Sequence, residues 1–250
     1  VIGALLFYFQ DCAWFPNIHG APVWKMLLVF VIGCTLLPVP SSMDIRGWQE
    51  MHPLNGPAWS LFFEYIANIL YALILRRLSN AILAAFALLA GAALVHLAVT
   101  NGHGDIIGGW SIEPAQLRVG FTRLLYPFLA GLLLSRVAKP GQLKHAFLLS
   151  AVLLIMMLSL PRIAAGGPVW INGLYDSLTV VLIFPLIVYI GASGDLQAGA
   201  NEKIGRLLGD ISYPLYMVHY PVMYTYMAWV AKNSPAPDQF PPMSQRILYA

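Results

Sequence analysis

Long hydrophobic runs, separated by short polar segments rich in proline and glycine, make up most of this chain. Runs of about 20 residues are long enough for a helix to cross the hydrocarbon core of a bilayer. Backbone groups in hydrocarbon must pair within their own segment, and the runs lack the alternation of a transmembrane barrel. We therefore predict an all-α transmembrane bundle of about eight spans. The predicted spans are roughly 1–9, 22–39, 58–75, 80–99, 119–137, 145–161, 173–193 and 209–231, and another can begin at 244–250.

Residues 55–71 combine a hydrophobic helix with a stripe of polar side chains. A carboxylate, Glu64, lies a little more than one turn inside this helix. A charged group in hydrocarbon costs about 2.5–3.5 kcal/mol by insertion scales, so its presence indicates a function. The alternative is that Glu64 only hydrogen-bonds Asn68 or a neighbouring helix. The stripe, set by intervals of three and four residues, consists of Ser60, Glu64, Asn68 and Tyr71.

A second polar face is predicted on the helix at 209–231. Pro214 is expected in the first turn of this helix, where the missing N–H does no harm. Pro221 falls in mid-helix, where it should produce a kink and free the carbonyl group near position 217. The face can form a polar pocket or a hydrogen-bonded clamp between helices. It consists of Ser212, Tyr216, His219 and Tyr220.

Composition supports a membrane protein and argues against several other classes. The chain has 250 residues, of which 59% are hydrophobic and 10% charged, whereas soluble domains have about 25% charged residues. The net charge of +3 is spread through the loops, so no nucleic-acid partner is predicted. Two cysteines cannot form a disulfide framework, and the six histidines have no metal-ligand spacing. We predict no metal site.

Two motifs resemble the integral-membrane acyltransferase-3 family. The first is Pro-x-Trp-Ser-Leu-x-x-Glu at 57–64, and the second is Ile-Ser-Tyr-Pro-Leu-Tyr-Met-Val-His-Tyr-Pro at 211–221. The resemblance spans nearly the whole chain and implies a single transmembrane acyltransferase domain over 1–250. It implies transfer of an acyl group, such as acetyl, from acyl-CoA to a hydroxyl of a sugar or cell-surface polysaccharide. The acyl-CoA would be a co-substrate used from the cytoplasmic side, with no bound cofactor. The implied partners are acyl-CoA, a carbohydrate or lipid-linked sugar acceptor and the bilayer. The implied location is the bacterial inner membrane.

The resemblance also implies residues that this chain lacks. Family members carry an Arg and a His about ten residues apart in the first helix, and that His is the expected base. They also have an Arg-rich loop before the third helix. Neither His19 nor His52 has neighbours that match the first of these patterns. We therefore expect the sequence to be a fragment of a bundle of about ten helices, truncated at both ends and inactive by itself.

The roles of individual residues follow from the motif positions. Glu64 and His219 are the candidate catalytic residues; an ionised Glu64 would orient an imidazolium, whereas a neutral one would donate a hydrogen bond to substrate. Arg76 and Arg77 are candidates to bind the phosphates of the coenzyme, although such a pair can also simply set topology. The candidate substrate-binding residues are Trp59, Ser60, Asn68 and Tyr216. Trp59 can instead be an interfacial anchor.

A different class of protein can use the same features. Secondary transporters and channels also need intramembrane carboxylates and kinked helices. The sequence shows no inverted repeat and no matching pair of broken helices in two halves, which weakens this alternative. In a purely structural bundle, the polar stripes would serve only as clamps.

Overall fold

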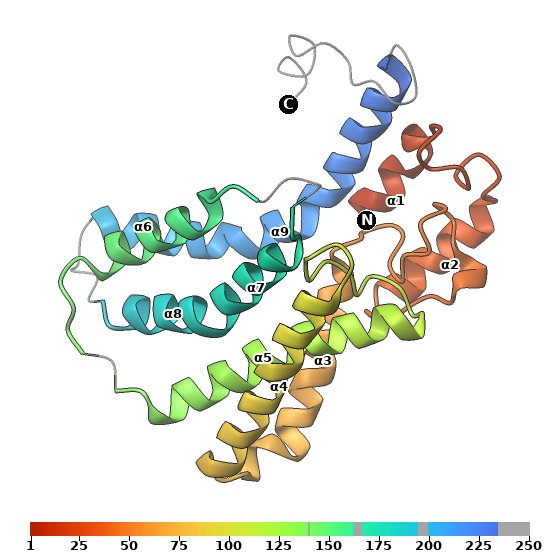
Figure 1. Ribbon diagram of the computed structural model, residues 1–250. Coiled ribbons are helices and arrows are strands. Elements are labelled where there is room, and N and C mark those ends of the chain that lie inside the picture. Colours follow the sequence, from red (N-terminus) through yellow and green to blue (C-terminus); the bar gives the residue numbers. More distant parts are fainter. Residues whose placement is uncertain (140, 163–166, 195–199, 235–250) are drawn as a thin grey trace. The chain divides into compact units, whose positions relative to one another are not determined.

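The computed structural model describes residues 1–139, 141–162, 167–194 and 200–234, and these fold as helices joined by loops (Figure 1). The all-α prediction is therefore confirmed for the described residues. The chain forms two compact units. Unit 1 comprises residues 1–62, 109–117 and the chain from 204 onwards, and unit 2 comprises residues 63–108 and 118–203.

Unit 1 consists of short helices, a long loop and most of one long helix. The loop begins where α2 ends, since Leu36 has a left-handed φ of 60° and Pro38 follows. The core of unit 1 is built from buried side chains that include Phe7, Phe15 and Tyr224. The elements are α1 (Ile2–Leu6), the 3-10 helices η1 (Phe7–Gln10) and η2 (Ser41–Met43), α2 (Val23–Gly33), the start of α3 (Ala58–Leu73) and α9 (Ala200–Asn233).

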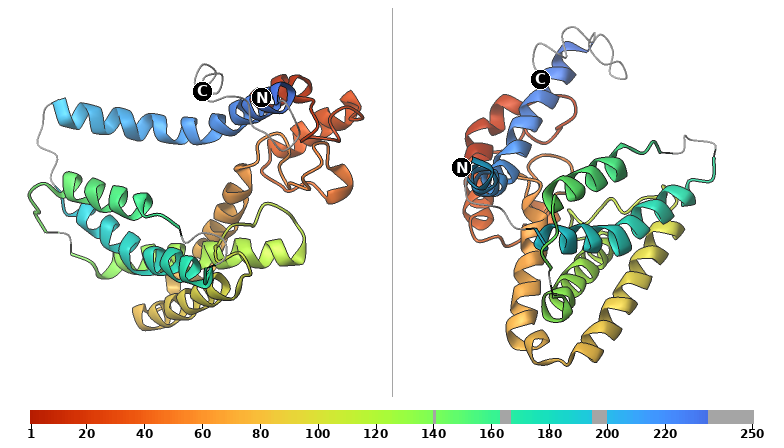
Figure 2. Two further views of the ribbon diagram at one scale, coloured as in Figure 1. Left: turned by 45° about the horizontal axis from the view of Figure 1, so that its top comes forward. Right: turned by 90° about the vertical axis from the view of Figure 1, so that its left-hand side faces the viewer.

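Unit 2 consists mainly of long apolar helices packed closely together. Helix α7 packs against α4, and α6 packs against α8 (Figure 2). Gly173 allows the first of these contacts, because a Cβ there would lie 2.0 Å from the carbonyl oxygen of Ala98. The elements after α3 are η3 (Leu75–Arg77), α4 (Asn80–Thr100), α5 (Pro114–Val137), α6 (Ala146–Ser159), α7 (Trp170–Leu178), a π-helical turn at Thr179–Ile183 and α8 (Phe184–Ala192).

Glycines also let aromatic rings approach α4 and α5. A Cβ on Gly91 would lie 3.0 Å from the ring of Tyr126, and one on Gly120 would lie 2.3 Å from the ring of Phe63. Phe63 also makes an edge contact with Phe121, with ring centroids 5.0 Å apart. Helix α3 therefore buries Phe63 against α5, and larger residues at these glycines would force the helices apart.

A proline in α8 leaves a backbone carbonyl that another helix satisfies. Pro185 follows the π-helical turn and has no N–H to donate to a carbonyl of that turn. The hydroxyl of Tyr126 on α5 donates to the carbonyl of Val181 in this turn. The contact compensates for the missing helical hydrogen bond and joins α5 to the continuous helical segment at Trp170–Ala192.

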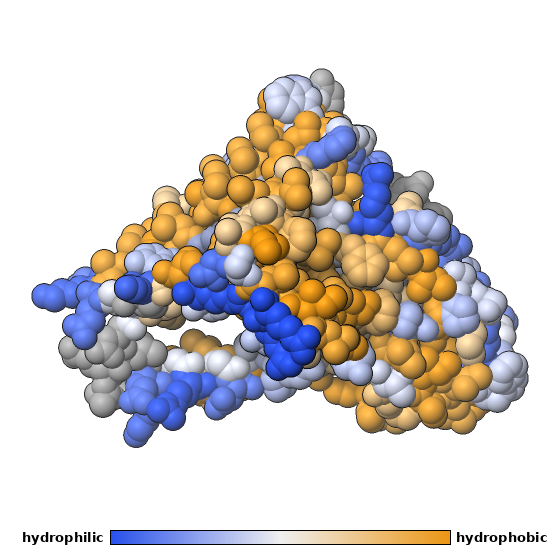
Figure 3. All heavy atoms as spheres, turned by 90° about the horizontal axis from the view of Figure 1, so that it is seen from below, coloured by the Kyte–Doolittle hydropathy of each residue, from blue (hydrophilic) through white to orange (hydrophobic). Residues whose placement is uncertain are grey.

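Three helical segments among the described residues are long and apolar enough to cross a membrane: Asn80–Thr100, Pro114–Val137 and Trp170–Ala192. The prediction of about eight full spans is therefore confirmed only in part. Several predicted spans are shorter apolar helices here, such as Val23–Gly33 and Ala146–Ser159. Apolar side chains such as Leu88, Phe147 and Leu158 remain exposed, as expected for lipid-facing helices. Figure 3 shows hydrophobic side chains over much of the face that it draws.

Helix α9 begins well before the predicted start at residue 209. It starts at Ala200, and its first turns contain charged residues such as Glu202 and Lys203. Pro214 therefore lies inside the helix rather than in its first turn, so the prediction for that proline was wrong. The apolar run at 209–231 marked only the part of α9 with little charge, whereas the helix itself begins earlier, in a polar sequence.

Candidate functional site

The two sequence motifs meet at the start of α3. The side-chain oxygen of Ser60 lies 2.6 Å from the hydroxyl of Tyr216 on α9. The carbonyl oxygen of Pro57 accepts from both side chains, at 3.2 Å from the Ser60 hydroxyl and 3.1 Å from the Tyr216 hydroxyl. Residues separated by more than 150 positions thus share one polar cluster, and Ser60 and Tyr216, both predicted to bind substrate, are in contact.

A second contact joins Asn55, two residues before the first motif, to the second motif through the carbonyl freed by a proline. Pro221 cannot donate to the carbonyl of Met217, and the side-chain amide of Asn55 donates to that oxygen at 3.1 Å. The predicted free carbonyl at position 217 is therefore confirmed. The carbonyl of Pro221 itself accepts hydrogen bonds from Gln10 at 2.9 Å and from Thr225 at 3.1 Å. These bonds tie α9 to the segment just before α3 and to the N-terminal segment.

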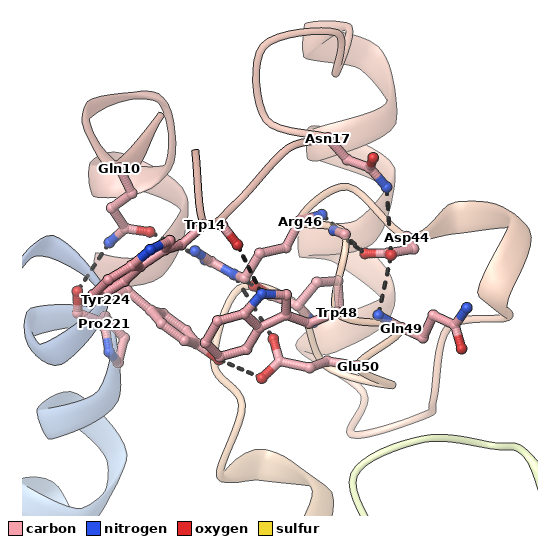
Figure 4. A network of polar contacts seen from close by, with 12 residues as sticks. Gln10, Trp14, Asn17, Asp44, Arg46, Trp48, Gln49, Glu50, Pro221 and Tyr224 are labelled. Carbon is pink, nitrogen blue, oxygen red and sulfur yellow. Dashed lines mark hydrogen bonds and ion pairs between the residues drawn. The ribbon is translucent and has the colours of Figure 1, made fainter. Parts of the chain in front are cut away.

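A buried ionic network lies beside this junction (Figure 4). Arg46, which has no exposed side-chain surface, donates from Nε to the Pro53 carbonyl at 2.9 Å and from Nη2 to Gln10 at 3.1 Å. Its guanidinium carbon lies 3.7 Å from the ring centroid of Tyr224. Glu50 is 3.7 Å from Arg46 Nε and accepts a 2.6 Å hydrogen bond from Tyr224. The network joins the long loop to α9.

The loop also supplies Asp44, which organises the backbone around Arg46. Its carboxylate accepts hydrogen bonds from the backbone N–H groups of Arg46 and Gly47, each at 2.9 Å, and of Gln49 at 3.1 Å. An aspartate that bonds backbone groups two or three residues later stabilises a tight turn. This turn directs Arg46 inward, where its charge meets aromatic rings and Glu50.

Glycine 56 brings the network directly against the first motif. A Cβ at this position would lie 2.5 Å from the Tyr224 hydroxyl and 2.9 Å from Glu50 Oε1. The backbone of Gly56 therefore packs on the hydrogen bond between those two side chains. Since Gly56 immediately precedes Pro57, the network fixes the position from which α3 starts.

Burial changes the proton affinity of two loop residues. Desolvation raises the pKa of Glu50 to about 7, although the Tyr224 hydrogen bond and Arg46 oppose the change. Desolvation lowers the pKa of His52 to about 4, against the effect of its bond to the Leu36 carbonyl. His52 is therefore neutral at pH 7. Its Nε2 lies 3.2 Å from the Leu36 carbonyl, which can only accept, so Nε2 carries the proton and Nδ1 is a bare acceptor.

A cavity of about 400 Å³ opens where the loop, α1, α2 and α9 meet. Most of its walls are apolar, and two of its polar lining residues, His52 and Asn55, retain unpaired acceptors. His52 Nδ1 and Asn55 Oδ1 are both buried and have no hydrogen-bond partner among the described residues. A buried acceptor without a partner costs about 1–3 kcal/mol. The lining residues outside the loop include Val29, Gly33, Met217 and Pro221.

The remaining predicted site residues have exposed or half-buried side chains, and two of them, Trp59 and His219, lie close in sequence to Ser60 and Tyr216. Glu64 is exposed, and Asn68 donates to its backbone carbonyl at 2.8 Å rather than to its carboxylate. Arg76 and Arg77 are exposed in η3, and Trp59 is half-buried. His219 is also exposed, with Nδ1 2.6 Å from the Tyr216 carbonyl. Their predicted functional roles stay predictions. Within the described ranges, no group of three or more His, Cys, Asp or Glu residues is placed to hold a metal ion.

Comparison with known proteins identifies the family of this chain. A family model described as an acyltransferase domain matches residues 1–250. The chain belongs to the acyltransferase-3 family. No curated protein and no solved structure matches it. The recognition made from the two motifs is thereby confirmed, and family membership favours an acyltransferase over the transporter alternative.

In this acyltransferase-3 chain, sequence reasoning missed the polar residues of the long loop. Sequence patterns gave Arg46 no role, and the neighbours of His52 do not match the expected motif. One signal was present: Asp44, Arg46, Glu50 and His52 alternate with apolar residues in a segment with no helical period. That density of charge between apolar runs is unusual in a chain with only 10% charged residues.

Proposed function

We propose that this member of the acyltransferase-3 family moves an acetyl or similar acyl group from acyl-CoA to a hydroxyl of a sugar or cell-surface polysaccharide. The observation that carries the proposal is the contact between the two motifs, made by Ser60 with Tyr216 and reinforced by Asn55, just before the first motif, with Met217. Two motifs far apart in the sequence supply neighbouring polar groups beside a cavity, which is the arrangement expected of a binding site.

The proposed reaction requires one proton transfer and one exchange of bonds. The acceptor hydroxyl oxygen bonds to the thioester carbonyl carbon, the carbon–sulfur bond breaks, and the hydroxyl proton passes through a base to the departing thiolate. We assign His219 as a base: the hydrogen bond between Nδ1 and the Tyr216 carbonyl places the proton on Nδ1 and leaves Nε2 to accept another. We assign Glu64 as an ionised carboxylate that orients the imidazole of the histidine expected in the family's first helix.

The other predicted residues are assigned to binding. Arg76 and Arg77 present two adjacent exposed cations, which suit the phosphates of a coenzyme. The acceptor is assigned to the polar groups near the start of α3. These are Trp59, Ser60, Asn68 and Tyr216.

The test uses the protein produced from its complete reading frame and held in membranes. Labelled acetyl-CoA is supplied with candidate sugar acceptors, and both acetylated product and released coenzyme A are measured. Glu64→Gln keeps the shape of the side chain but removes the charge, and should lower transfer by about 10²–10⁴-fold. His219→Ala should give a loss of similar size.

Two exposed residues provide matched controls. Glu113→Gln and His103→Ala make the same chemical changes at exposed positions outside the motifs and should leave transfer unchanged. Normal transfer by a well-folded Glu64→Gln protein would contradict the charged role of Glu64. Absence of transfer or coenzyme release by the unmodified protein with every acceptor would count against the proposed function itself.

A further inference from the structure

An apolar groove lies within unit 2, between the second half of α3, α4 and α5. Its volume is about 380 Å³, which is within the range of small-molecule sites. The right-hand view of Figure 2 shows α3 and α4 diverging from the turn that joins them. Every lining residue that the structure describes is Ala, Leu or Phe, and the set includes Leu70, Leu89 and Phe128. The groove is accessible from outside the protein, since Leu89 is 68% exposed.

Three arginines lie at the η3 end of this groove. Leu75, the first residue of η3, lines the groove, and the exposed Arg76 and Arg77 follow it directly. Arg136 on α5 donates from Nη2 to the carbonyl of Leu75 at 3.0 Å and from Nη1 to that of Leu78 at 2.7 Å. A guanidinium has five N–H groups, so N–H groups of Arg136 remain to donate to an anion. Its charge therefore lies beside a residue of the groove wall.

The charge of these arginines is not neutralised by neighbouring carboxylates. The groove and η3 are built from residues within 65–104 and 114–175, and these two stretches contain no Asp or Glu. In the part of the chain that the structure describes, the ion pairs are made by His19, Arg46 and Arg162 instead. Adjacent cations without an acidic partner favour an anionic ligand. The alternative is that they only set the topology of the chain.

The walls beside the arginines restrict the kind of anion that fits. The phosphates of coenzyme A are joined to its acyl group by an arm with polar amide groups, and the apolar side chains of the walls offer those amides no hydrogen bond. Inorganic phosphate would leave the hydrocarbon surface uncovered. A phospholipid carries its phosphate a few bonds from its acyl chains, so one molecule meets both requirements. A choline head group would bring another cation to the arginines, which favours an anionic phospholipid over a zwitterionic one.

We propose that this groove binds an anionic phospholipid, with one acyl chain against α4 and α5 and the phosphate accepting hydrogen bonds from Arg136 and from the arginines of η3. The site goes beyond the proposed function and does not rest on it. A coenzyme and the lipid would compete for Arg76 and Arg77, whereas the groove itself is specific to the lipid. The bound lipid would hold α3, α4 and α5 together at their η3 end.

The first test compares two phospholipids on the unmodified protein. The protein made from its complete reading frame is purified in detergent with equal amounts of dioleoylphosphatidylglycerol and dioleoylphosphatidylcholine, and native mass spectrometry counts the molecules of each that remain bound. The acyl chains are identical, so the head group alone distinguishes the probes. Phosphatidylglycerol should be retained about tenfold more than phosphatidylcholine, because each arginine near the phosphate favours negative charge by a few-fold. Equal retention would overturn the proposal without any variant having to fold.

The second test locates the bound lipid in the groove. Ala93→Phe adds a ring at an exposed position of the groove wall and should lower the retention of phosphatidylglycerol about tenfold. Ala92→Phe makes the same change at an exposed neighbour that does not line the groove, so it should leave retention unchanged. Equal retention by these two variants would overturn the groove as the binding site. Displacement of the lipid by coenzyme A from a correctly folded Ala93→Phe protein with full retention would assign the arginines to the coenzyme alone.

The third test concerns the head group. Arg136→Gln should reduce the preference for phosphatidylglycerol from about tenfold to about twofold, while retention of phosphatidylcholine stays the same. The control is Arg118→Gln, at an exposed arginine near the other end of α5, which should keep the full preference. The double variant Arg76→Gln with Arg77→Gln changes only exposed side chains and should also reduce the preference. A full preference in both arginine variants would mean that these residues serve topology, and would overturn the head-group site.

Discussion

The two units contain the same backbone defect but satisfy it in different ways. In unit 2, Pro185 removes an N–H next to a π-helical turn, and a tyrosine from a neighbouring apolar helix donates to the carbonyl of Val181 in that turn. In unit 1, Pro221 frees the carbonyl of Met217, and Asn55 from the end of a polar loop donates to it. The first solution joins two helices. The second fixes a loop and the start of α3 against α9, and so brings the two family motifs together.

The difference extends to the surroundings of each carbonyl. Among the residues that the structure describes, every charged side chain in the buried set lies in unit 1: Asp44, Arg46 and Glu50. Buried polar residues of unit 2, such as Asn172 and Thr179, carry no charge. Unit 2 relies instead on close packing at glycines such as Gly173. Unit 1 should consequently be the part more sensitive to loss of a charge, and unit 2 the part more sensitive to added volume.

The strongest test of this contrast is Arg46→Ala. Removal of the guanidinium leaves Glu50 buried without its cation and opens space among Phe7, Phe15 and Tyr224. Breaking a buried ion pair from one side costs about 3–5 kcal/mol while the remaining group stays charged, so the measurement is made above pH 7, where Glu50 is ionised. We expect unit 1 to lose stability by about that amount, measured by limited proteolysis in detergent, with cleavage sites assigned to each unit by mass spectrometry.

The matched control for this prediction is Arg118→Ala. Arg118 is an exposed arginine on α5, so the same substitution should change the stability of either unit by less than about 0.5 kcal/mol. Equal proteolytic resistance of Arg46→Ala and Arg118→Ala would show that the buried network contributes little, and the contrast between the units would lose its energetic basis.

A smaller effect is expected when either freed carbonyl loses its donor. Asn55→Leu in unit 1 and Tyr126→Phe in unit 2 should each cost about 1–3 kcal/mol, the penalty for a buried polar group without a partner. Restoring the helical N–H should offset the loss, so Pro221→Ala is expected to rescue Asn55→Leu. Pro185→Ala should rescue Tyr126→Phe in the same way. Thermal unfolding of the four single and two double variants gives the coupling energies.

The cross-combinations are the controls for these cycles. Pro185→Ala with Asn55→Leu, and Pro221→Ala with Tyr126→Phe, pair changes from different units and should be additive within about 0.5 kcal/mol. A coupling energy in the cross-combinations would mean that the prolines act in some way other than by freeing a nearby carbonyl. The absence of a coupling energy in the matched pairs would mean the same.

Sequence patterns predicted the helices and the proline effect better than they predicted the loop. The span at 80–99 became helix Asn80–Thr100 almost unchanged, because an unbroken apolar run has only one structure available in hydrocarbon. The carbonyl at 217 could be predicted because the effect of a proline is local. The burial of Arg46 and His52 could not be predicted, since it depends on contacts with η1, with the segment after α2 and with α9 that no local period encodes. The contact between Ser60 and Tyr216 likewise joins residues 156 positions apart.

The smallest expected effect is the pH dependence of unit 1, because two buried groups oppose each other. The pKa of Glu50 rises from 4.5 to about 7 on folding, so the folded state binds more protons between these values and stability falls as the pH rises. The pKa of His52 falls from 6.5 to about 4, so the unfolded state binds more protons and stability rises with pH in that range. Between about pH 4.5 and 6.5 the two slopes should nearly cancel.

Two single variants separate these opposing effects. In Glu50→Gln, the free energy of unfolding should increase from pH 4 to 6.5, and in His52→Gln it should decrease from pH 4.5 to 7. Slopes of the same sign in both variants, measured by urea unfolding monitored in unit 1, would show that these two residues do not control the response.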